Sequence, residues 1–99
     1  MKHAGADTLN ALEPLLRQIR KHDLLVEKTP GSFYLSSKAF LHFHEDPAGI
    51  FVDLKENLLT FTRYRTTTRS EQRNLLNRVD RCLRRCRQDQ QNSRNKAAI

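Results

Sequence analysis

The chain has no long apolar run and few cysteines, and each scarcity excludes a class of protein. No segment approaches the roughly 18 consecutive apolar residues of a membrane span, and the opening residues MKHAGADTLN lack the apolar centre of a secretory signal. The two cysteines, Cys82 and Cys86, lie four residues apart on an expected helix, which is poor geometry for a structural disulfide. These absences predict a cytoplasmic protein in a reducing compartment, without a membrane partner.

Tryptophan is absent, and aromatic residues are limited to five phenylalanines and two tyrosines. A chain of 99 residues suits one domain and buries about 60 to 65% of the surface that its unfolded form exposes. We therefore expect a modest core. Contacts with a partner, or with a second copy of the chain, would supply burial that the monomer lacks.

Acidic residues are scarce in the C-terminal third of the chain. Residues 63–99 contain eleven Lys or Arg and three Asp or Glu, whereas residues 1–62 contain seven and eight. The net charge of +7 is thus concentrated after residue 62. This asymmetry indicates an acidic partner.

The clearest structural signal is a β-hairpin over Ala39 to Leu54. Two runs of alternating apolar residues flank Asp46-Pro47-Ala48-Gly49, whose residue types favour a turn. With this turn, His42 lies opposite Asp53. Alternation with a period of two then separates a buried face from a mixed face. The buried face carries Ala39, Leu41, Phe43, Ile50, Val52 and Leu54, and the mixed face carries Phe40, His42, His44, Phe51 and Asp53.

Two further strands are expected beside this hairpin. A three-residue connection at residues 36–38 joins it to a strand over residues 32–35 and sets Leu35 opposite Ala39, whereas a two-residue turn would reverse the sides of that strand. A turn at residues 56–57 joins the hairpin to a fourth strand. In this arrangement Leu59 faces Leu54 and Phe61 faces Val52, while Tyr34, Thr60, Thr62 and Tyr64 extend the mixed face.

A helix is predicted before the sheet and another after it. Over about residues 8–22, Leu9, Leu12, Leu16 and Ile19 recur at steps of three and four. Pro14 leaves two readings open: either the regular helix begins near Glu13, or a longer helix kinks at the proline. The second helix begins at the capping box Thr68-Arg69-Ser70-Glu71. Its apolar stripe contains Leu75, Leu76, Val79, Cys82, Leu83 and Cys86.

These elements predict an α+β fold in the order α-β-β-β-β-α. The sheet is a four-stranded antiparallel meander, and both helices pack on its apolar face. Residues 1–88 form this single domain, and the polar residues 89–99 form a disordered tail. The mixed face of the sheet is left open to solvent, to a ligand or to a second subunit.

The open face carries the candidate ligand or interface residues. A carboxylate at Asp53 can fix the tautomer of the His42 imidazole, so this pair is an exposed polar pair, a binding site or a catalytic pair. No nucleophile stands out beside them, and we assign no catalytic residue. The full set of candidates is Tyr34, Phe40, His42, His44, Phe51 and Asp53.

Metal binding is the second reading of the same histidines. His42 and His44 alternate on one strand, about 7 Å apart, and Asp46 or Asp53 would be a third ligand. The sequence shows no fourth ligand, and the spacing of the two cysteines to these histidines is not a recognised zinc motif. We therefore predict neither a metal nor a cofactor.

Nucleic-acid binding is an alternative with two possible surfaces. The aromatic residues of the open face would stack on bases, but an aromatic RNA-binding motif is absent, and burial in an interface between copies is favoured. Arginines outside the apolar stripe of the last helix would contact phosphates. These nucleic-acid candidates are Arg73, Arg78, Arg81, Arg84 and Arg85.

The run KTPGSFYLSSKAFLHFHEDPAGIFVDLKE, residues 28–56, followed by RTTTRSEQRNLLNRVD, resembles a small uncharacterised family of bacterial proteins with a strand-rich centre and a helix at each end. The order of elements is also loosely similar to that of YjbR-like proteins with a CyaY-like fold. The resemblance covers about half of the chain and implies no active-site residues, and a shared fold does not convey function.

The leading hypothesis is a small non-enzymatic binding or interaction module that uses the open sheet face, with a homodimer as one form. The first alternative is a nucleic-acid-binding protein that uses the arginine-rich helix. The second is an enzyme or metal protein built on His42, His44 and Asp53.

Overall fold

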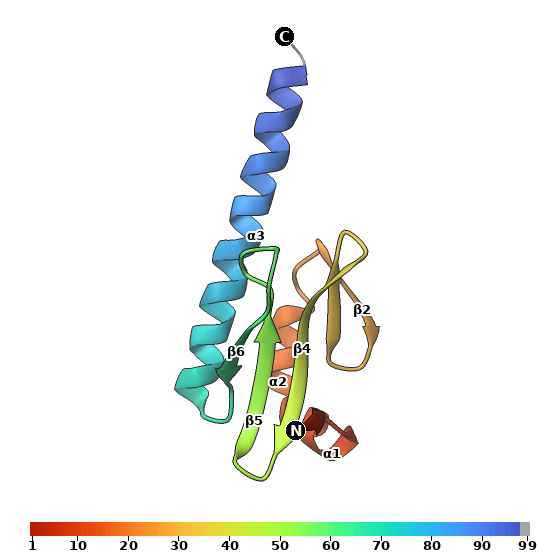
Figure 1. Ribbon diagram of the computed structural model, residues 1–99, viewed down its shortest axis with the longest axis vertical. Coiled ribbons are helices and arrows are strands. Elements are labelled where there is room, and N and C mark those ends of the chain that lie inside the picture. Colours follow the sequence, from red (N-terminus) through yellow and green to blue (C-terminus); the bar gives the residue numbers. More distant parts are fainter. Residues whose placement is uncertain (98–99) are drawn as a thin grey trace.

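An antiparallel sheet with helices on one face forms the frame of the protein (Figure 1). The computed structural model describes residues 1–97. A short strand, β1 (Lys2–His3), pairs with the end of β4 that β3 does not reach. The predicted α+β class is confirmed, but the meander has five consecutive strands where four were expected. The five strands are β2 (Leu25–Thr29), β3 (Ser32–Leu35), β4 (Lys38–Asp46), β5 (Gly49–Leu54) and β6 (Thr62–Arg65).

The hairpin of β4 and β5 has the predicted turn and register. Asp46 pairs with Gly49 across the turn, and His42 pairs with Asp53. The Asp46 carboxylate accepts a hydrogen bond of 3.0 Å from the Ala48 amide, as expected for an aspartate that opens a turn. Gly49 leaves the turn with a φ of +139°, a region that favours glycine.

Two helices precede the sheet where one was expected over residues 8–22. The first is α1 (Ala6–Ala11) and the second is α2 (Glu13–Ile19). The chain breaks at Leu12, whose φ of −91° and ψ of 4° are not helical, and Pro14 lies in the first turn of α2. Both readings of the proline are thus partly correct: a regular helix does begin at Glu13, and helical residues precede it.

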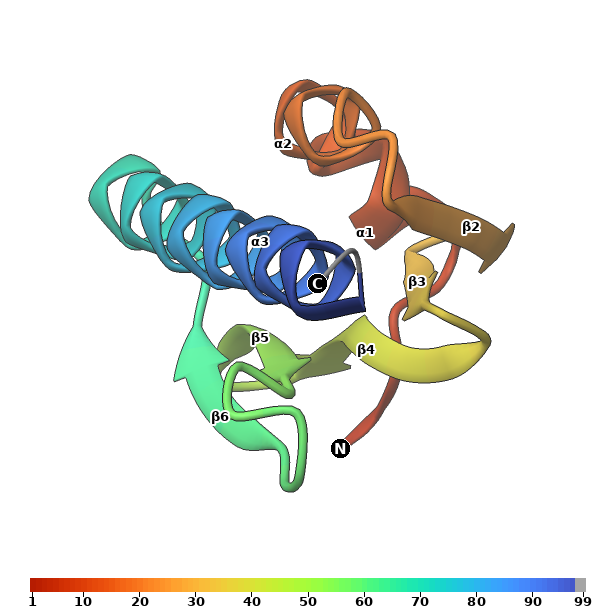
Figure 2. The same ribbon diagram turned by 90° about the horizontal axis from the view of Figure 1, so that it is seen from above.

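Helices α2 and α3 (Arg69–Ala97) lie on the same side of the sheet, as Figure 2 shows. The predicted apolar stripe of α3 is confirmed, although Leu76 and Cys86 are only half-buried. Burial raises the pKa of the Cys82 thiol to about 11, so this cysteine behaves as an apolar core residue. The core joins four residues of α1–α2, six of the sheet and four of α3: Leu12, Leu15, Leu16, Ile19, Phe33, Phe40, Leu41, Phe43, Val52, Leu54, Leu75, Val79, Cys82 and Leu83.

The predicted position of Phe40 on the open face is wrong, because β4 contains a β-bulge at this residue. Leu35 pairs with Lys38, not with Ala39 as predicted, because the turn has two residues, Ser36 and Ser37. Both turn residues have positive φ, which matches the two-residue hairpin turns. The register then shifts by one residue around Phe40, so that Phe40 is buried in the core instead of lying on the open face.

The connection between β5 and β6 is longer than the two-residue turn predicted at residues 56–57. Leu54 pairs with Thr62, not with Leu59, so the predicted register of the fourth strand is wrong. The Asn57 side chain holds the wider loop, because its Oδ1 accepts from the amides of Leu59 (2.9 Å) and Thr60 (2.8 Å). Consequently Leu59 is 81% exposed, Phe61 lies in the loop, and Tyr64 packs against the helix-covered core.

Strand β2 was not predicted because its sequence lacks a clear alternation. It forms the edge of the sheet beside β3 and carries charged side chains, Glu27 and Lys28. Charged residues on an edge strand discourage pairing with another chain. Arg20, next to the end of α2, bonds the Glu27 carboxylate at 2.6 and 3.1 Å and ties this edge to the helix layer.

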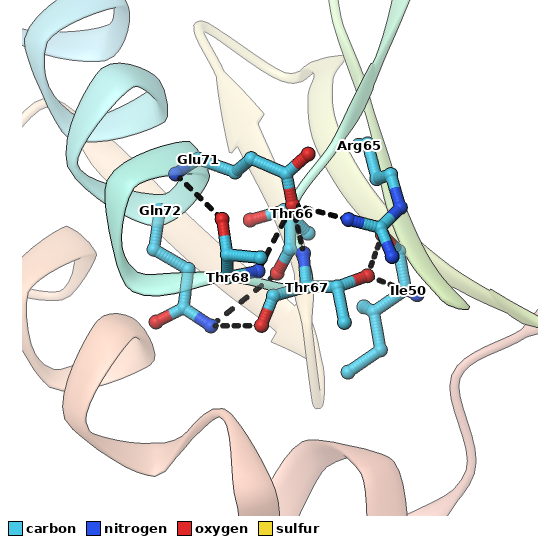
Figure 3. A network of polar contacts seen from close by, with 7 residues as sticks. All are labelled: Ile50, Arg65, Thr66, Thr67, Thr68, Glu71 and Gln72. Carbon is cyan, nitrogen blue, oxygen red and sulfur yellow. Dashed lines mark hydrogen bonds and ion pairs between the residues drawn. The ribbon is translucent and has the colours of Figure 1, made fainter.

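The predicted capping box at the start of α3 is confirmed (Figure 3). The Thr68 amide donates to Glu71 Oε1 at 2.9 Å, and the Glu71 amide donates to Thr68 Oγ1 at 3.2 Å. The same carboxylate oxygen accepts from Arg65 at 2.9 Å. Thr67 Oγ1 bonds both the amide and the carbonyl of Ile50, so the helix start is tied directly to β5.

Helix α3 continues to Ala97, past residue 88, where a polar tail was expected. Residues 89–97 contain neither proline nor glycine, and a helix that has already formed gains one hydrogen bond for each residue added. Residues 98 and 99 of that tail lie outside the described part of the chain. In Figure 1 the last turns of α3 project beyond the sheet.

Substituting Thr68→Ala should lower the free energy of unfolding by about 1 kcal/mol, because the amide of Glu71 loses its side-chain acceptor. Ser70→Ala, two residues along on the exposed first turn, is the matched control and should change stability by less than about 0.5 kcal/mol. Chemical denaturation of the three proteins measures both values. Equal losses for the two variants would show that the cap does not stabilise the helix.

Candidate functional site

The sheet face opposite α2 and α3 carries a cluster of mostly polar side chains from five strands, β1 and β3 to β6. Strand pairing sets two rows across this face, with β4 in the middle of each. One row consists of Ser32, His42, Asp53 and Arg63, and the other consists of His3, His44, Phe51 and Arg65.

The Asp53 carboxylate is the centre of this cluster. Its Oδ2 lies 3.0 Å from His44 Nε2 and 3.5 Å from His42 Nε2. Arg63 binds both oxygens of the same group, with Nε 2.8 Å from Oδ1 and Nη2 2.9 Å from Oδ2. Asp53 is 9% exposed, and a buried carboxylate requires such partners. The hydrogen bonds from Arg63 hold the pKa of Asp53 below its usual value, against the opposing effect of burial.

The surroundings of the His42 imidazole favour its neutral form. Burial lowers its pKa, the neighbouring His44 lowers it further, and Asp53 opposes this shift. The ring is therefore mostly neutral at pH 7, with one nitrogen that donates a hydrogen bond and one that carries a lone pair. Phe61, from the loop before β6, meets the His42 ring edge-on with 4.9 Å between ring centroids and shields one side of the cluster.

His3 and Arg63 were not identified from the sequence. Strand β1 sets His3 opposite His44, and the His3 ring centroid lies 5.2 Å from that of His44 and 5.8 Å from that of His42. No sequence pattern links a two-residue strand to a partner some 40 residues away. Arg63 was missed because the fourth strand was predicted in the wrong register, although its alternation with Arg65 was visible.

The aromatic part of the predicted open face is smaller than expected. Phe40 is in the core, as described above. Tyr34 and Phe51 are half-buried on the open face, and the Lys28 ammonium lies 4.4 Å from the centroid of the Tyr34 ring. The middle of this face is consequently polar, because imidazole, carboxylate and guanidinium groups occupy it.

Most of the predicted arginines gather at a second place, beside the loop that precedes β6. A groove of about 540 Å³ is lined by Glu56, Arg78, Arg81, Arg84 and Arg85, whereas Arg73 is not part of it. Arg78 bonds Glu56 at 3.2 Å and lies 4.4 Å from the centroid of the Tyr64 ring. Arg84 pairs with Asp80 at 3.0 Å.

Three side chains on the open face form a group that could hold one metal ion. The ligand atoms of His42, His44 and Asp53 all lie within 4.8 Å of one another. Two ligands of a tetrahedral zinc ion, with bonds of 2.0–2.1 Å, lie about 3.3 Å apart. The observed distances of 3.0 and 3.5 Å from Asp53 Oδ2 to the two imidazole nitrogens bracket that value. A site that combines these histidines with Cys82 and Cys86 is excluded, because α3 covers the other face of the sheet.

Comparison with protein-family models, with curated proteins and with solved structures found no match. The resemblance to a bacterial family and to YjbR-like proteins thus stays a prediction. Within residues 1–97, none of the helices is both long and apolar enough to cross a membrane.

The His42 imidazole should titrate below the ordinary histidine pKa of about 6.5. Asp53→Asn should lower this pKa further, because a negative charge that favours imidazolium is lost, and His44→Ala should raise it, because the lowering effect of the neighbouring imidazole is lost. NMR titration of the ring resonances measures all three values. Shifts in the same direction for the two variants would contradict this arrangement of charges.

Proposed function

We propose that the chain is a small binding module whose open sheet face holds one divalent transition-metal ion. The observation that carries this proposal is the convergence of His42 Nε2 and His44 Nε2 on a single oxygen of Asp53. Two imidazoles and one carboxylate are a common zinc-binding set, and an ion bound to them keeps a further position free for another ligand. Nickel and copper ions also favour imidazole nitrogen, so selectivity depends on the geometry that strands β4 and β5 impose.

Arg63 acts as a positioning residue for this site. Its two hydrogen bonds fix the plane of the Asp53 carboxylate, as outer partners of metal ligands commonly do. A carboxylate offers about four lone-pair sites, so Oδ2 can accept from Arg63 and still face the imidazoles. The positive charge of Arg63 also repels a cation, which limits the affinity of the site.

No reaction is proposed at this site. Within the described part of the chain, neither histidine ring is hydrogen-bonded to a hydroxyl or a thiol that would act as a nucleophile. The cluster has the features of a binding site.

Purified protein should bind one zinc ion per chain, and His42→Ala or His44→Ala should each weaken binding by about tenfold or more, because each removes a ligand. Isothermal titration calorimetry in a buffer that does not chelate zinc measures the affinity and the stoichiometry. His22→Ala is the matched control, since it removes a histidine that is not on the open sheet face. Binding that the two cluster variants retain, or that His22→Ala also loses, would contradict the site.

Association of two copies through the open face stays a prediction. The polar centre of that face suits an ion better than a large apolar contact. Sedimentation velocity with and without zinc separates a metal-dependent dimer from a dimer that forms without the ion.

The arginine groove supports a second candidate function, the binding of nucleic-acid phosphates. Four arginines line it, and only two acidic side chains pair with them: Glu56 with Arg78, and Asp80 with Arg84. Among residues 1–97, Arg81 and Arg85 form no ion pair, so their guanidinium groups are available to bind phosphate oxygens. The excess of positive charge in residues 63–99 also favours a nucleic acid as the partner.

Arg81→Gln and Arg85→Gln should each weaken binding of a mixed-sequence oligonucleotide and reduce the slope of log affinity against log salt by about 1. Arg73→Gln, which removes the same charge outside the groove, should leave both quantities unchanged. Fluorescence anisotropy at several salt concentrations measures them. Equal effects at Arg73 and Arg81 would show that net charge matters and the groove does not.

A further inference from the structure

We propose that His3 is the third imidazole of the metal site, and that the bound ion fastens the N-terminal segment, residues 1–5, to β4. This inference rests on the proposed function, because it requires an ion at His42, His44 and Asp53. It adds a ligand that comes from another strand, and it gives the ion a structural consequence.

The ring positions carry the inference. Imidazoles that share one tetrahedral ion, with zinc–nitrogen bonds of 2.0–2.1 Å, have ring centroids roughly 5 Å apart. The three rings have centroid separations of 4.7 Å between His42 and His44, 5.2 Å between His3 and His44, and 5.8 Å between His3 and His42. All three separations are close to that value, so His3 reaches the ion by a small turn of its side chain.

Strand pairing sets His3 opposite His44, and its ring is turned toward the other two histidine rings. The side chain is exposed, and its ring nitrogens form no hydrogen bond with the described side chains, those of residues 1–89. The ring nonetheless lies over the other two histidines instead of extending into solvent. Imidazole nitrogen is a common zinc ligand, so the His3 ring beside these residues is chemically suited to be a fourth ligand.

The backbone of the segment is held against β4 by Glu45. The Gly5 amide donates to Glu45 Oε1 at 2.6 Å, and Thr8 Oγ1 donates to Oε2 at 2.9 Å. The Ala4 amide donates to the Phe43 carbonyl at 3.1 Å. A Cβ atom at Gly5 would lie 3.1 Å from Glu45 Oε1, so glycine permits this close approach. These contacts place His3 at the site before any ion is bound.

Strand β1 contains only two residues, and so short a strand has little stability of its own. An ion that joins His3 to His42, His44 and Asp53 closes a loop between the start of the chain and the middle of the sheet. The site then has four protein ligands, as structural zinc sites have. Binding of the ion and docking of residues 1–5 are therefore coupled, and each favours the other.

The test compares the wild-type protein with His3→Ala and His3→Gln, and uses zinc together with cobalt(II), whose visible spectrum reports the geometry and identity of its ligands. Each substitution should weaken zinc binding by about tenfold or more, as loss of a ligand requires, and should shift the cobalt spectrum, because water replaces one imidazole nitrogen. His22→Ala should change neither. Thermal unfolding without metal verifies that the variants fold.

Hydrogen exchange measures the structural consequence. Zinc should slow exchange of the Ala4 and Gly5 amides in the wild-type protein and should leave these amides unchanged in both His3 variants. If the variants bind zinc as tightly as the wild type, the inference is overturned and the site at His42, His44 and Asp53 stands. If the wild type binds no zinc, the proposed function is overturned and the inference with it.

Discussion

The register between β4 and β5 is the constraint on which the rest of the structure depends. Side chains alternate between the two faces of the sheet, so this one pairing sends Phe43, Val52 and Leu54 to the helices and His42 and Asp53 to the open face. A slip of one residue would bury the polar cluster and expose the core. The Asp46–Gly49 turn fixes this register at one end of the hairpin. The hydrogen bonds between Thr67 and Ile50 then tie the start of α3 to β5.

A buried negative charge then organises the open face. Removing the Asp53 carboxylate from water is costly unless hydrogen bonds replace its solvation, and Arg63 on β6 and the histidines on β4 supply them. The same requirement draws side chains from three strands to one point, which is also the arrangement that a metal ion needs. The arginine groove lies apart from this point, beside α3, and its uncompensated positive charge suits anions. The two proposed ligands therefore do not compete for one surface.

The sequence predicted correctly those features that depend on residues close together in the chain. The capping box at Thr68 formed because its two hydrogen bonds involve residues three apart, and the apolar stripe of α3 followed from helical periodicity. Prediction failed where one residue changes the register. The bulge at Phe40 moved an aromatic ring from the open face to the core, and the Asn57 loop displaced β6 so that Tyr64 packs under the helix instead. Neither the bulge nor the longer loop leaves a signal in the spacing of apolar residues, so periodicity could not reveal them.

The sequence by itself determined that His42, His44 and Asp53 share one face of a hairpin, since a four-residue turn and a period of two leave no other register that buries the apolar side chains. Only the tertiary structure decided which groups join them. His3 arrives through the pairing of β1 with β4, and Arg63 arrives through the pairing of β6 with β5. These contacts depend on chain segments that meet after the loops between them have closed, and loop closure is governed by the packing of the whole domain instead of by local residue preference.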